Sequence, residues 1–197
     1  KLVGSTLKSA RRRGKFLLLS FARDGADELV LAANPMLAGR FWLLDGGAEK
    51  VRARTGLRLR FADGGELRYV DREMLGKLYL VRPDALDVIP GWTEMGPDAD
   101  DPTLTVDAFR QRIRRHPGEL KSLLRNSRFV SGIGKSYRHQ NLWGAQPPPL
   151  QPRTALYPSR TALLHPALHP RLPPRTVRVP YVSAPTTRLR HPKSPLP

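Results

Sequence analysis

The chain has 197 residues, which is enough for one ordinary domain or two small ones. Its 34 Lys and Arg outnumber its 17 Asp and Glu, so the formal net charge is +17, and this balance favours polyanions, first of all nucleic acid, as partners. The absence of cysteine excludes disulfides, thiolate zinc sites, iron–sulfur clusters and a thiol nucleophile among these residues. The apolar runs are too short to cross a bilayer, so we expect no membrane partner.

Three zones of different composition follow one another along the chain. Residues 1–92 are rich in strand signals, residues 93–145 hold a connector and then helical signals, and residues 146–197 hold 14 of the 20 prolines. Charge is also uneven, because every acid lies at or before Glu119 and the residues after it carry 13 Lys and Arg. The sequence begins at Lys1 rather than Met, and we expect it to be a fragment.

The first zone predicts an antiparallel β-sandwich or barrel made of six short strands. In Leu57–Phe61, apolar residues alternate with arginines. Asp63-Gly64 then supplies a turn, and the chain returns in Glu66–Val70. This hairpin is expected to have one apolar face and one basic face. The other strand candidates are residues 15–21, 28–33, 40–44 and 77–81.

A basic run, Arg11-Arg12-Arg13-Gly14-Lys15, precedes the first of these strand candidates. Such a run is commonly a solvated approach to a strand. In the functional interpretation, Lys15 stands at the start of the strand and faces a phosphate.

Three helical stretches are predicted after the connector. The first starts behind Thr105, an N-cap residue, and ends at Pro117-Gly118. The second covers residues 119–126 and the third covers residues 135–145, on either side of a tight turn at Ser131–Gly134.

The turn between the last two helical stretches is the strongest candidate binding feature. A Gly132-Ile133-Gly134 turn lets backbone N–H groups point outward together, and the next helix adds its own N–H groups and positive dipole end. Such a nest holds a phosphate without reading a base. Lys135 adds positive charge directly after the turn, and Lys121, Arg125 and Arg128 are its expected neighbours. The alternative is an ordinary corner between two helices.

The residues by themselves form no catalytic or metal-binding pattern. The five His are scattered, and no P-loop, kinase or nucleophile-elbow signature is present. We therefore expect no metal and no cofactor. Residues 146–197 are rich in Pro and Arg and contain no acid, which predicts a disordered basic tail; an arm that binds nucleic acid is the alternative.

Two stretches match a known pattern: Arg12-Arg13-Gly14-Lys15-Phe16-Leu17-Leu18-Leu19 and Leu124-Arg125-Asn126-Ser127-Arg128-Phe129-Val130-Ser131-Gly132-Ile133-Gly134-Lys135-Ser136-Tyr137. Between them, Asn34–Arg40 stands where the pattern has His-Leu-Gly-Met-Thr-Gly-Arg, and Asp71–Gly76 stands near its Asp-Pro-Arg-Arg-Phe-Gly. With this order of segments, the chain resembles the formamidopyrimidine-DNA glycosylase/endonuclease VIII family of base-excision repair enzymes.

The resemblance implies an α+β fold of two lobes, an antiparallel β-sandwich followed by a helical lobe with a helix–two-turn–helix, and duplex DNA bound between them. It implies excision of oxidised purines such as formamidopyrimidine and 8-oxoguanine, followed by AP-lyase cleavage through a Schiff base. It also implies a monomer in the cytoplasm, associated with the bacterial nucleoid.

The resemblance also assigns contacts residue by residue. Lys15 matches a strand lysine that contacts phosphate near the lesion, and Lys121 matches a lysine of the helical lobe. Lys135 stands where the family has an Asn that binds phosphate, and Arg40 ends the first loop segment as a further DNA-binding candidate. Leu37 and Leu75 align with residues that fill the void left by the extruded base.

Other features depart from the family. Its nucleophile, an N-terminal Pro followed by Glu, and its C-terminal four-cysteine zinc finger have no counterpart in the sequence, and Glu73 stands where the family has Arg. A shifted reading frame in a GC-rich gene would give such a tail, and reading the other two frames tests this. We expect the chain to bind DNA weakly and not to cut it; the alternative is a non-enzymatic nucleic-acid-binding protein.

Overall fold

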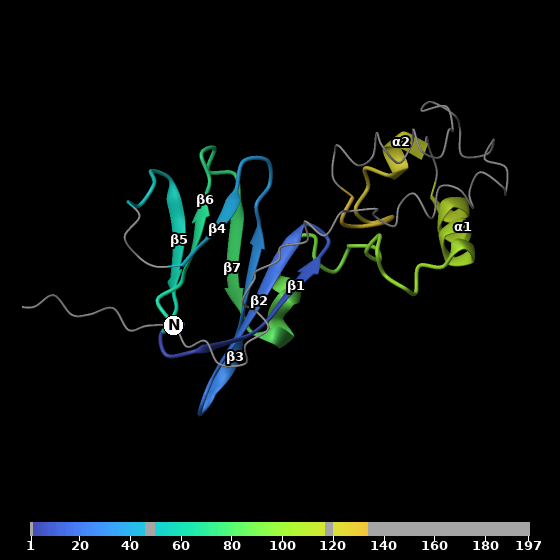
Figure 1. Cartoon of the computed structure of the whole chain (residues 1–197). Coiled ribbons are helices and arrows are strands. Elements are labelled where there is room, and N and C mark those ends of the chain that lie inside the picture. The colour runs from blue at the N-terminus through green and yellow to red at the C-terminus, as the bar shows by residue number, and fades with distance from the viewer. Residues whose placement is uncertain (1, 46–49, 117–119, 134–197) are drawn as a thin grey trace, which may run out of the picture. The chain divides into compact units, whose positions relative to one another are not determined.

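The computed structural model describes residues 2–45, 50–116 and 120–133. These residues form two compact units, which divide at the Ile89–Pro90 bond (Figure 1). The predicted third helix, residues 135–145, and the predicted tail, residues 146–197, lie outside the described residues. Within the described part of the chain, no helix has the length and apolar character needed to cross a membrane.

The described part of the first unit consists mainly of two antiparallel sheets (Figure 1). Sheet A has the order β1-β2-β3-β7, and its strands are β1 (Thr6–Arg13), β2 (Phe16–Arg23), β3 (Ala26–Asn34) and β7 (Lys77–Val81). Sheet B has the order β4-β6-β5, and its strands are β4 (Arg40–Leu44), β5 (Thr55–Arg60) and β6 (Glu66–Val70). The prediction of antiparallel sheets is confirmed.

The first strand, β1, was missed by the sequence pattern. Arg11, Arg12 and Arg13 pair with β2 as the last residues of β1, so the basic run is a strand and not an approach to one. Gly14, with a φ of 58°, and Lys15 then make a tight turn. Because β1 lies at the edge of sheet A, it tolerates charged residues that break the apolar alternation by which strands are recognised.

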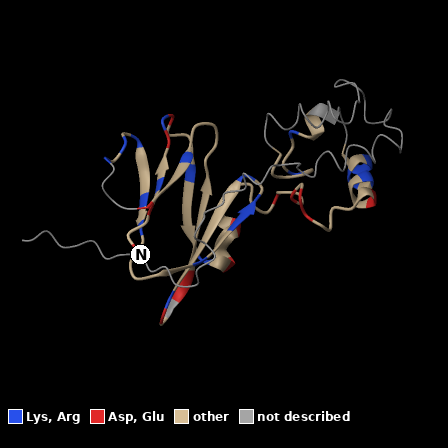
Figure 2. Ribbon diagram, viewed as in Figure 1, with Lys and Arg blue, Asp and Glu red and all other residues tan. Residues whose placement is uncertain are grey.

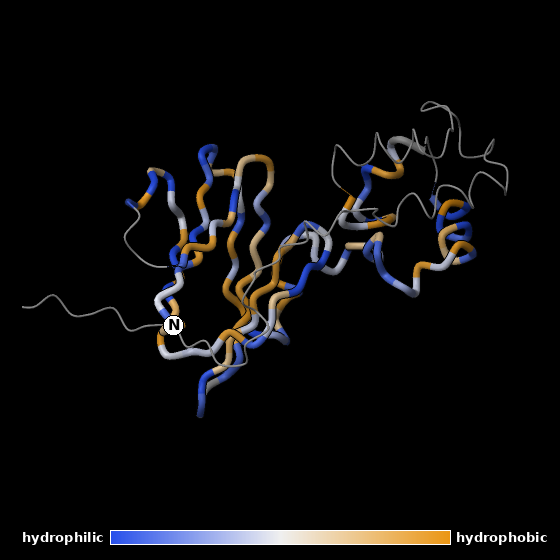
Figure 3. The backbone as a smooth tube through the Cα atoms, viewed as in Figure 1, coloured by the Kyte–Doolittle hydropathy of each residue, from blue (hydrophilic) through white to orange (hydrophobic). Residues whose placement is uncertain are grey.

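The two sheets pack face to face through alternating apolar side chains. Their shared buried cluster comprises Leu19, Phe21, Leu31, Leu59, Phe61 and Leu67, none more than 6 % exposed. Figure 3 shows hydrophobic residues running along β2 and β3. The opposite face of sheet A is buried as well, at Leu18, Val30 and Ala32, and the 3₁₀ helix η1 (Pro83–Val88) lies next to β3. On sheet B, Arg58, Arg60, Glu66 and Arg68 lie on the face directed away from the shared cluster.

The second unit holds α1 (Val106–Arg115) and the short α2 (Leu120–Leu123). The predicted N-cap is confirmed, because the Thr105 hydroxyl accepts a hydrogen bond from the Ala108 N–H at 3.2 Å. α2 is shorter than the predicted stretch 119–126, since the N–H groups of Arg125 and Asn126 bond the carbonyls three residues back, as in turns. The apolar core of this unit is formed by Ala99, Leu104, Phe109, Ile113, Leu123, Leu124, Phe129, Val130 and Ile133.

Candidate nucleic-acid interface

The strand register places three connections, the β1–β2 turn, the β3–β4 loop and the β6–β7 loop, at the same end of the sandwich. In sheet A, Leu17 pairs with Ala33 and Asn34 pairs with Lys77, so the β1–β2 turn, the end of β3 and the start of β7 are neighbours. The β3–β4 loop, residues 35–39, and the β6–β7 loop, residues 71–76, both leave from that end. We call this region, made of Gly14–Lys15 and the two loops, the loop end.

The Asp71 carboxylate fixes the β6–β7 loop. It accepts hydrogen bonds from the Gly76 N–H at 2.6 Å, the Glu73 N–H at 3.2 Å and the Tyr69 hydroxyl at 3.2 Å. These bonds, foremost the one from Gly76, lower the pKa of Asp71. Burial, with a contribution from Asp71, raises the pKa of Tyr69 to about 12. Tyr69 therefore stays a neutral donor, and Asp71 an ionised acceptor, around neutral pH.

Two glycines let both loops close on the same tyrosine. A Cβ added at Gly76 would lie 1.7 Å from the Tyr69 hydroxyl oxygen, and one added at Gly39 would lie 2.3 Å from it. No side chain fits at either distance, so these are close approaches that require glycine. The hydroxyl of Tyr69 thereby fixes the β3–β4 loop and the β6–β7 loop relative to one another.

Each of these loops exposes an apolar Met-Leu pair. Met36 and Leu37 are 55 % and 77 % exposed, and Met74 and Leu75 are 60 % and 45 % exposed. Both methionines have a positive φ, 51° at Met36 and 55° at Met74, which is uncommon for a residue with a side chain. Leu37 and Leu75 were singled out from the sequence and Met36 and Met74 were not, although an apolar pair inside a turn segment was a usable signal.

Positive charge borders the apolar pairs. Lys15 is exposed in the β1–β2 turn rather than at the first position of a strand, which corrects the expectation. Arg40 is exposed at the start of β4, where its Nη1 donates to the Gly39 carbonyl at 3.2 Å. Figure 2 shows further basic residues on β1 beside the turn, where Arg12 Nη1 donates to the Gly14 carbonyl at 2.8 Å. A rim of cations around apolar side chains is suited to DNA, because the phosphates are anionic and the base faces are apolar.

The predicted basic face of the β5–β6 hairpin is built around an acid. Glu66 is only 2 % exposed and accepts hydrogen bonds from Arg58 Nε at 2.8 Å, from Arg60 Nε at 3.3 Å and from Arg68 Nε. The bonds from Arg58, and then those from Arg68, lower the pKa of Glu66 to about 2 despite its burial. The arginines of this hairpin thus share one face, as expected, and part of their charge is engaged by Glu66.

In the second unit, Arg112 on α1 holds the segment that leads to the Gly-x-Gly turn. Its Nε donates to the Phe129 carbonyl and its Nη2 to the Arg128 carbonyl, both at 2.8 Å. On the other side, the Ser131 N–H donates to the Pro97 carbonyl at 2.8 Å, and the Ser131 hydroxyl bonds Asp98 at 2.8 Å. Residues 128–131 are thus fixed from two directions.

The predicted phosphate nest is described only in part. Gly132 has a φ of 85°, as a tight turn requires, and Arg125 is exposed after α2. Arg128, an expected neighbour, donates from Nε to Glu94 at 2.8 Å. Gly134, Lys135 and the Lys121 side chain lie outside the described residues, so the nest stays a prediction.

In the described part of the chain, no three His, Asp or Glu side chains come together in a way that could hold a metal ion. The four-cysteine zinc site implied by the resemblance does not fit the 197 residues, since none of them is cysteine.

Comparisons with known proteins agree with this architecture. Residues 1–78 match the family described as the formamidopyrimidine-DNA glycosylase N-terminal domain. The formamidopyrimidine-DNA glycosylase of Bacillus licheniformis is 31 % identical over 165 residues, which are 83 % of this chain and 58 % of that protein. The enzyme of the same name from Latilactobacillus sakei is 27 % identical over 164 residues, which are 83 % and 57 %. The chain thus spans a little more than half the length of these curated relatives.

Solved structures of DNA complexes are also similar. The Lactococcus lactis formamidopyrimidine-DNA glycosylase bound non-covalently to DNA with an AP site gives a TM-score of 0.74 at 25 % identity, over 86 % of this chain and 63 % of that one. A complex of the Lactococcus lactis enzyme with abasic-site DNA gives 0.73 at 26 % identity, over 86 % and 60 %. Since the strand unit, the order of segments and these relatives agree, the chain belongs to the formamidopyrimidine-DNA glycosylase family.

Proposed function

We propose that the chain is part of a base-excision repair DNA glycosylase and AP lyase that acts on oxidised purines, formamidopyrimidine and 8-oxoguanine, in duplex DNA. The loop end is the observation that carries this proposal. It presents two exposed Met-Leu pairs, fixed around one buried tyrosine and bordered by Lys15 and Arg40. The relatives of known structure are bound to DNA with abasic sites, which supports the same ligand class for this chain.

In this proposal, the loop end enters the base stack at the lesion. Leu37 and Leu75 fill the space that an extruded base leaves, which offsets part of the unstacking cost of a few kcal/mol. Rigid loops serve this purpose, because a wedge that yields would not hold the stack open; Asp71 and the contacts of Gly39 and Gly76 with Tyr69 supply that rigidity. Lys15 and Arg40 pair with the flanking phosphates.

The second unit holds the DNA backbone away from the lesion. Lys121, Arg125 and Lys135 neutralise phosphates, and the Gly132–Gly134 turn offers backbone N–H groups to one of them. Phosphate contacts of this kind supply affinity without sequence preference. The hydrogen bonds from Arg112 to residues 128 and 129 support the proposal, because they position the segment before the turn.

The base-removal chemistry belongs to the whole enzyme. The family uses the amine of a proline that is followed by glutamate, and the 197 residues contain no Pro-Glu dipeptide. Tested by itself, the polypeptide of residues 1–197 is therefore expected to bind DNA with 8-oxoguanine or an abasic site and to form no borohydride-trapped adduct. A covalent band above background would contradict this expectation.

Binding to damaged and intact duplexes tests the proposed function. The chain is expected to prefer a duplex with a tetrahydrofuran abasic-site analogue over the intact duplex. Leu37→Ser combined with Leu75→Ser should reduce that preference by roughly tenfold or more, because the wedge no longer offsets unstacking. Fluorescence anisotropy with labelled duplexes measures both affinities.

A matched double variant controls for the loss of exposed apolar side chains as such. Leu80→Ser with Val88→Ser also removes two exposed apolar side chains of the first unit, 39 % and 63 % exposed, and should leave the preference unchanged. Equal binding of damaged and intact duplexes by the unaltered chain would instead favour a non-enzymatic nucleic-acid-binding protein.

A further inference from the structure

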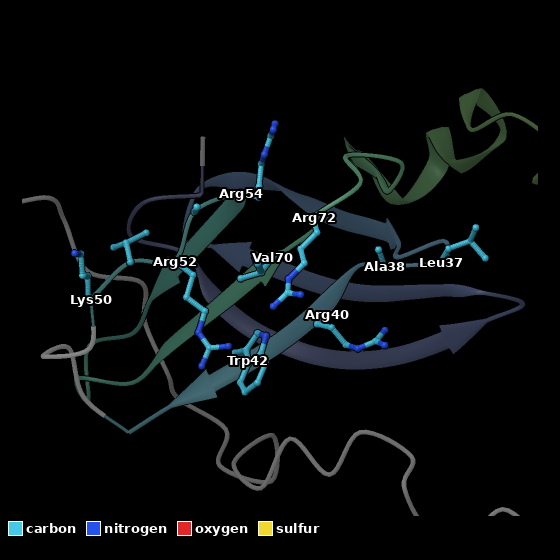
Figure 4. A pocket seen from close by; sticks show the side chains of 11 residues that line it. Leu37, Ala38, Arg40, Trp42, Lys50, Arg52, Arg54, Val70 and Arg72 are labelled. Carbon is cyan, nitrogen blue, oxygen red and sulfur yellow. The ribbon is translucent and has the colours of Figure 1, made fainter.

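The outward face of sheet B carries an open pocket of about 960 Å³ (Figure 4). Its floor is formed by Trp42 on β4 and Val70 on β6, and its wall is formed by the segment 50–54 that precedes β5. Among the described residues that line it, five are basic and none is acidic. The basic ones are Arg40, Lys50, Arg52, Arg54 and Arg72.

Hydrogen bonds fix the wall of this pocket at both ends. Arg68, only 2 % exposed, donates from Nη1 to the Lys50 carbonyl at 3.1 Å. At the other end, the Asp71 N–H donates to the Arg54 carbonyl at 3.0 Å. Between them, the Thr55 hydroxyl donates to the Arg52 carbonyl at 2.7 Å. The pocket is therefore formed before any ligand binds.

An aromatic ring lies among the cations. Trp42 is 40 % exposed, and the Arg52 guanidinium carbon lies 4.1 Å from its ring centroid. Figure 4 shows Arg52 and Arg72 directed toward the space beside Trp42, while Arg54 points away and the Arg40 side chain extends from β4 toward the Leu37 side of the pocket. A stacked Arg–Trp pair with further arginines around it offers both a platform for a base and partners for phosphates.

We propose that this pocket binds single-stranded nucleic acid, with one base stacked on the Arg52–Trp42 pair and the adjoining phosphates paired with Arg40 and Arg72. The positive lining selects a polyanion, and the aromatic platform selects one that carries planar rings over an acidic peptide. The recess selects a single strand over a duplex, because its volume suits one or two nucleotides and the bases of a duplex are already stacked on each other.

This inference goes beyond the proposed duplex-binding function and does not depend on it. Trp42, Lys50 and Arg52 have no part in the proposed wedge or phosphate contacts of the loop end. Arg40 belongs to both sites and Leu37 also lines the pocket, so the two functions are separated at Lys50 and Arg52. Loss of single-strand binding by variants at these two positions should leave the lesion preference intact.

Tryptophan fluorescence of the full 197-residue chain tests the inference. In a chain with Trp92→Phe and Trp143→Phe, the indole of Trp42 is the sole tryptophan emitter. Oligothymidylate of about ten nucleotides, a length within the usual site sizes, should quench it in a saturable way. Lys50→Ser with Arg52→Ser should weaken that binding by roughly tenfold, since it removes the arginine half of the stacking platform. Because it also removes two cations, the slope of log K against log salt should fall by up to about 1.4.

Matched variants and competitors decide between the outcomes. Lys8→Ser with Arg23→Ser removes the same charge from exposed positions outside the pocket and should leave the Trp42 quenching unchanged. Circular dichroism checks that each variant is folded. The inference is overturned if both double variants weaken binding equally, if polyglutamate of equal charge competes as well as oligothymidylate, or if a duplex of equal phosphate number quenches Trp42 more strongly than the single strand.

Discussion

At the scale of single residues, Glu66 shows how this basic chain stabilises a buried charge. Its carboxylate is 2 % exposed and meets three guanidinium groups, of which that of Arg68 is equally buried. A buried ion pair adds little net stability by itself, but removal of one partner leaves the other charge without compensation. Glu66 is therefore the acid whose loss the first unit should tolerate least.

Glu66→Gln keeps the shape of the side chain and removes its charge. We expect a loss of about 3–5 kcal/mol in the free energy of unfolding, because the buried Arg68 guanidinium loses the carboxylate that its Nε bonds. Urea titration followed by circular dichroism measures this loss. Asp84→Asn is the control, since its bond to Arg82 joins two exposed side chains and is worth about 1 kcal/mol or less.

The same carboxylate predicts a dependence of stability on pH. The folded-state pKa of Glu66 is lowered to about 2, while an unfolded glutamate titrates near about 4.3. The stability from its ionisation is fully present above the unfolded value and is lost as the pH falls toward the folded value. The unaltered chain should therefore lose more stability than Glu66→Gln between about pH 4.3 and pH 2, and equal losses would contradict the assignment.

At the scale of elements, the loops and not the strands give the first unit its candidate site. The β3–β4 loop and the β6–β7 loop approach the Tyr69 hydroxyl through Gly39 and Gly76, and Asp71 bonds both that hydroxyl and the second loop. The orientation of the exposed Met-Leu pairs depends on these contacts. A change that separates the loops should therefore affect binding as well as stability.

Gly76→Ala tests the close approach of the β6–β7 loop. The added methyl group overlaps the Tyr69 hydroxyl, so we expect the chain to lose about 1–3 kcal/mol of stability and most of its preference for abasic-site duplex. Gly56→Ala is the control, because its Cβ would lie 3.7 Å from the nearest Tyr69 atom, an ordinary contact. Combining Gly76→Ala with Tyr69→Phe should restore part of the loss. No restoration would show that the hydroxyl is not the obstacle.

At the scale of the whole molecule, charge is the dominant property. The net charge is +17, and the residues after Glu119 contribute 13 Lys and Arg without a single acid. Eight of these lie between Arg153 and Lys193. Binding by these eight residues would be sensitive to salt and indifferent to sequence and damage, and it would add to any binding by the loop end and the Gly-x-Gly turn.

Removing residues 146–197 separates the two sources of affinity. We expect affinity for all DNA to fall, and the slope of log K against log salt to fall by about 0.9 for each lost duplex phosphate contact. The shortened chain should keep its preference for damaged duplex. In that chain, Lys135→Glu should nearly abolish the remaining duplex binding, since it puts a negative charge beside the predicted nest. Loss of all binding on truncation alone would refute an independent anchor in the second unit.

Local pattern predicted much of the fold. Alternation and strand signals identified six of the seven described strands, and Thr105 as an N-cap residue identified the start of α1. The pattern missed β1, an edge strand rich in arginine, and overstated α2, where turn hydrogen bonds take over at Arg125. Both errors arise where contacts with neighbouring segments, and not the intrinsic strand or helix preference of the residues, determine the backbone conformation.

The sequence by itself determined the basic charge, the strand-rich first unit, the capped helix α1 and the family, because each depends on composition, on spacing between near neighbours or on motif order. Only the tertiary structure decided which charges remain available. It turned the arginines of the β5–β6 hairpin toward Glu66, brought two Met-Leu loops to one tyrosine, and placed residues 50–54 over Trp42. Each of these contacts joins segments that are apart in the sequence. Strand register and packing bring them together, and a local sequence pattern contains no information about either.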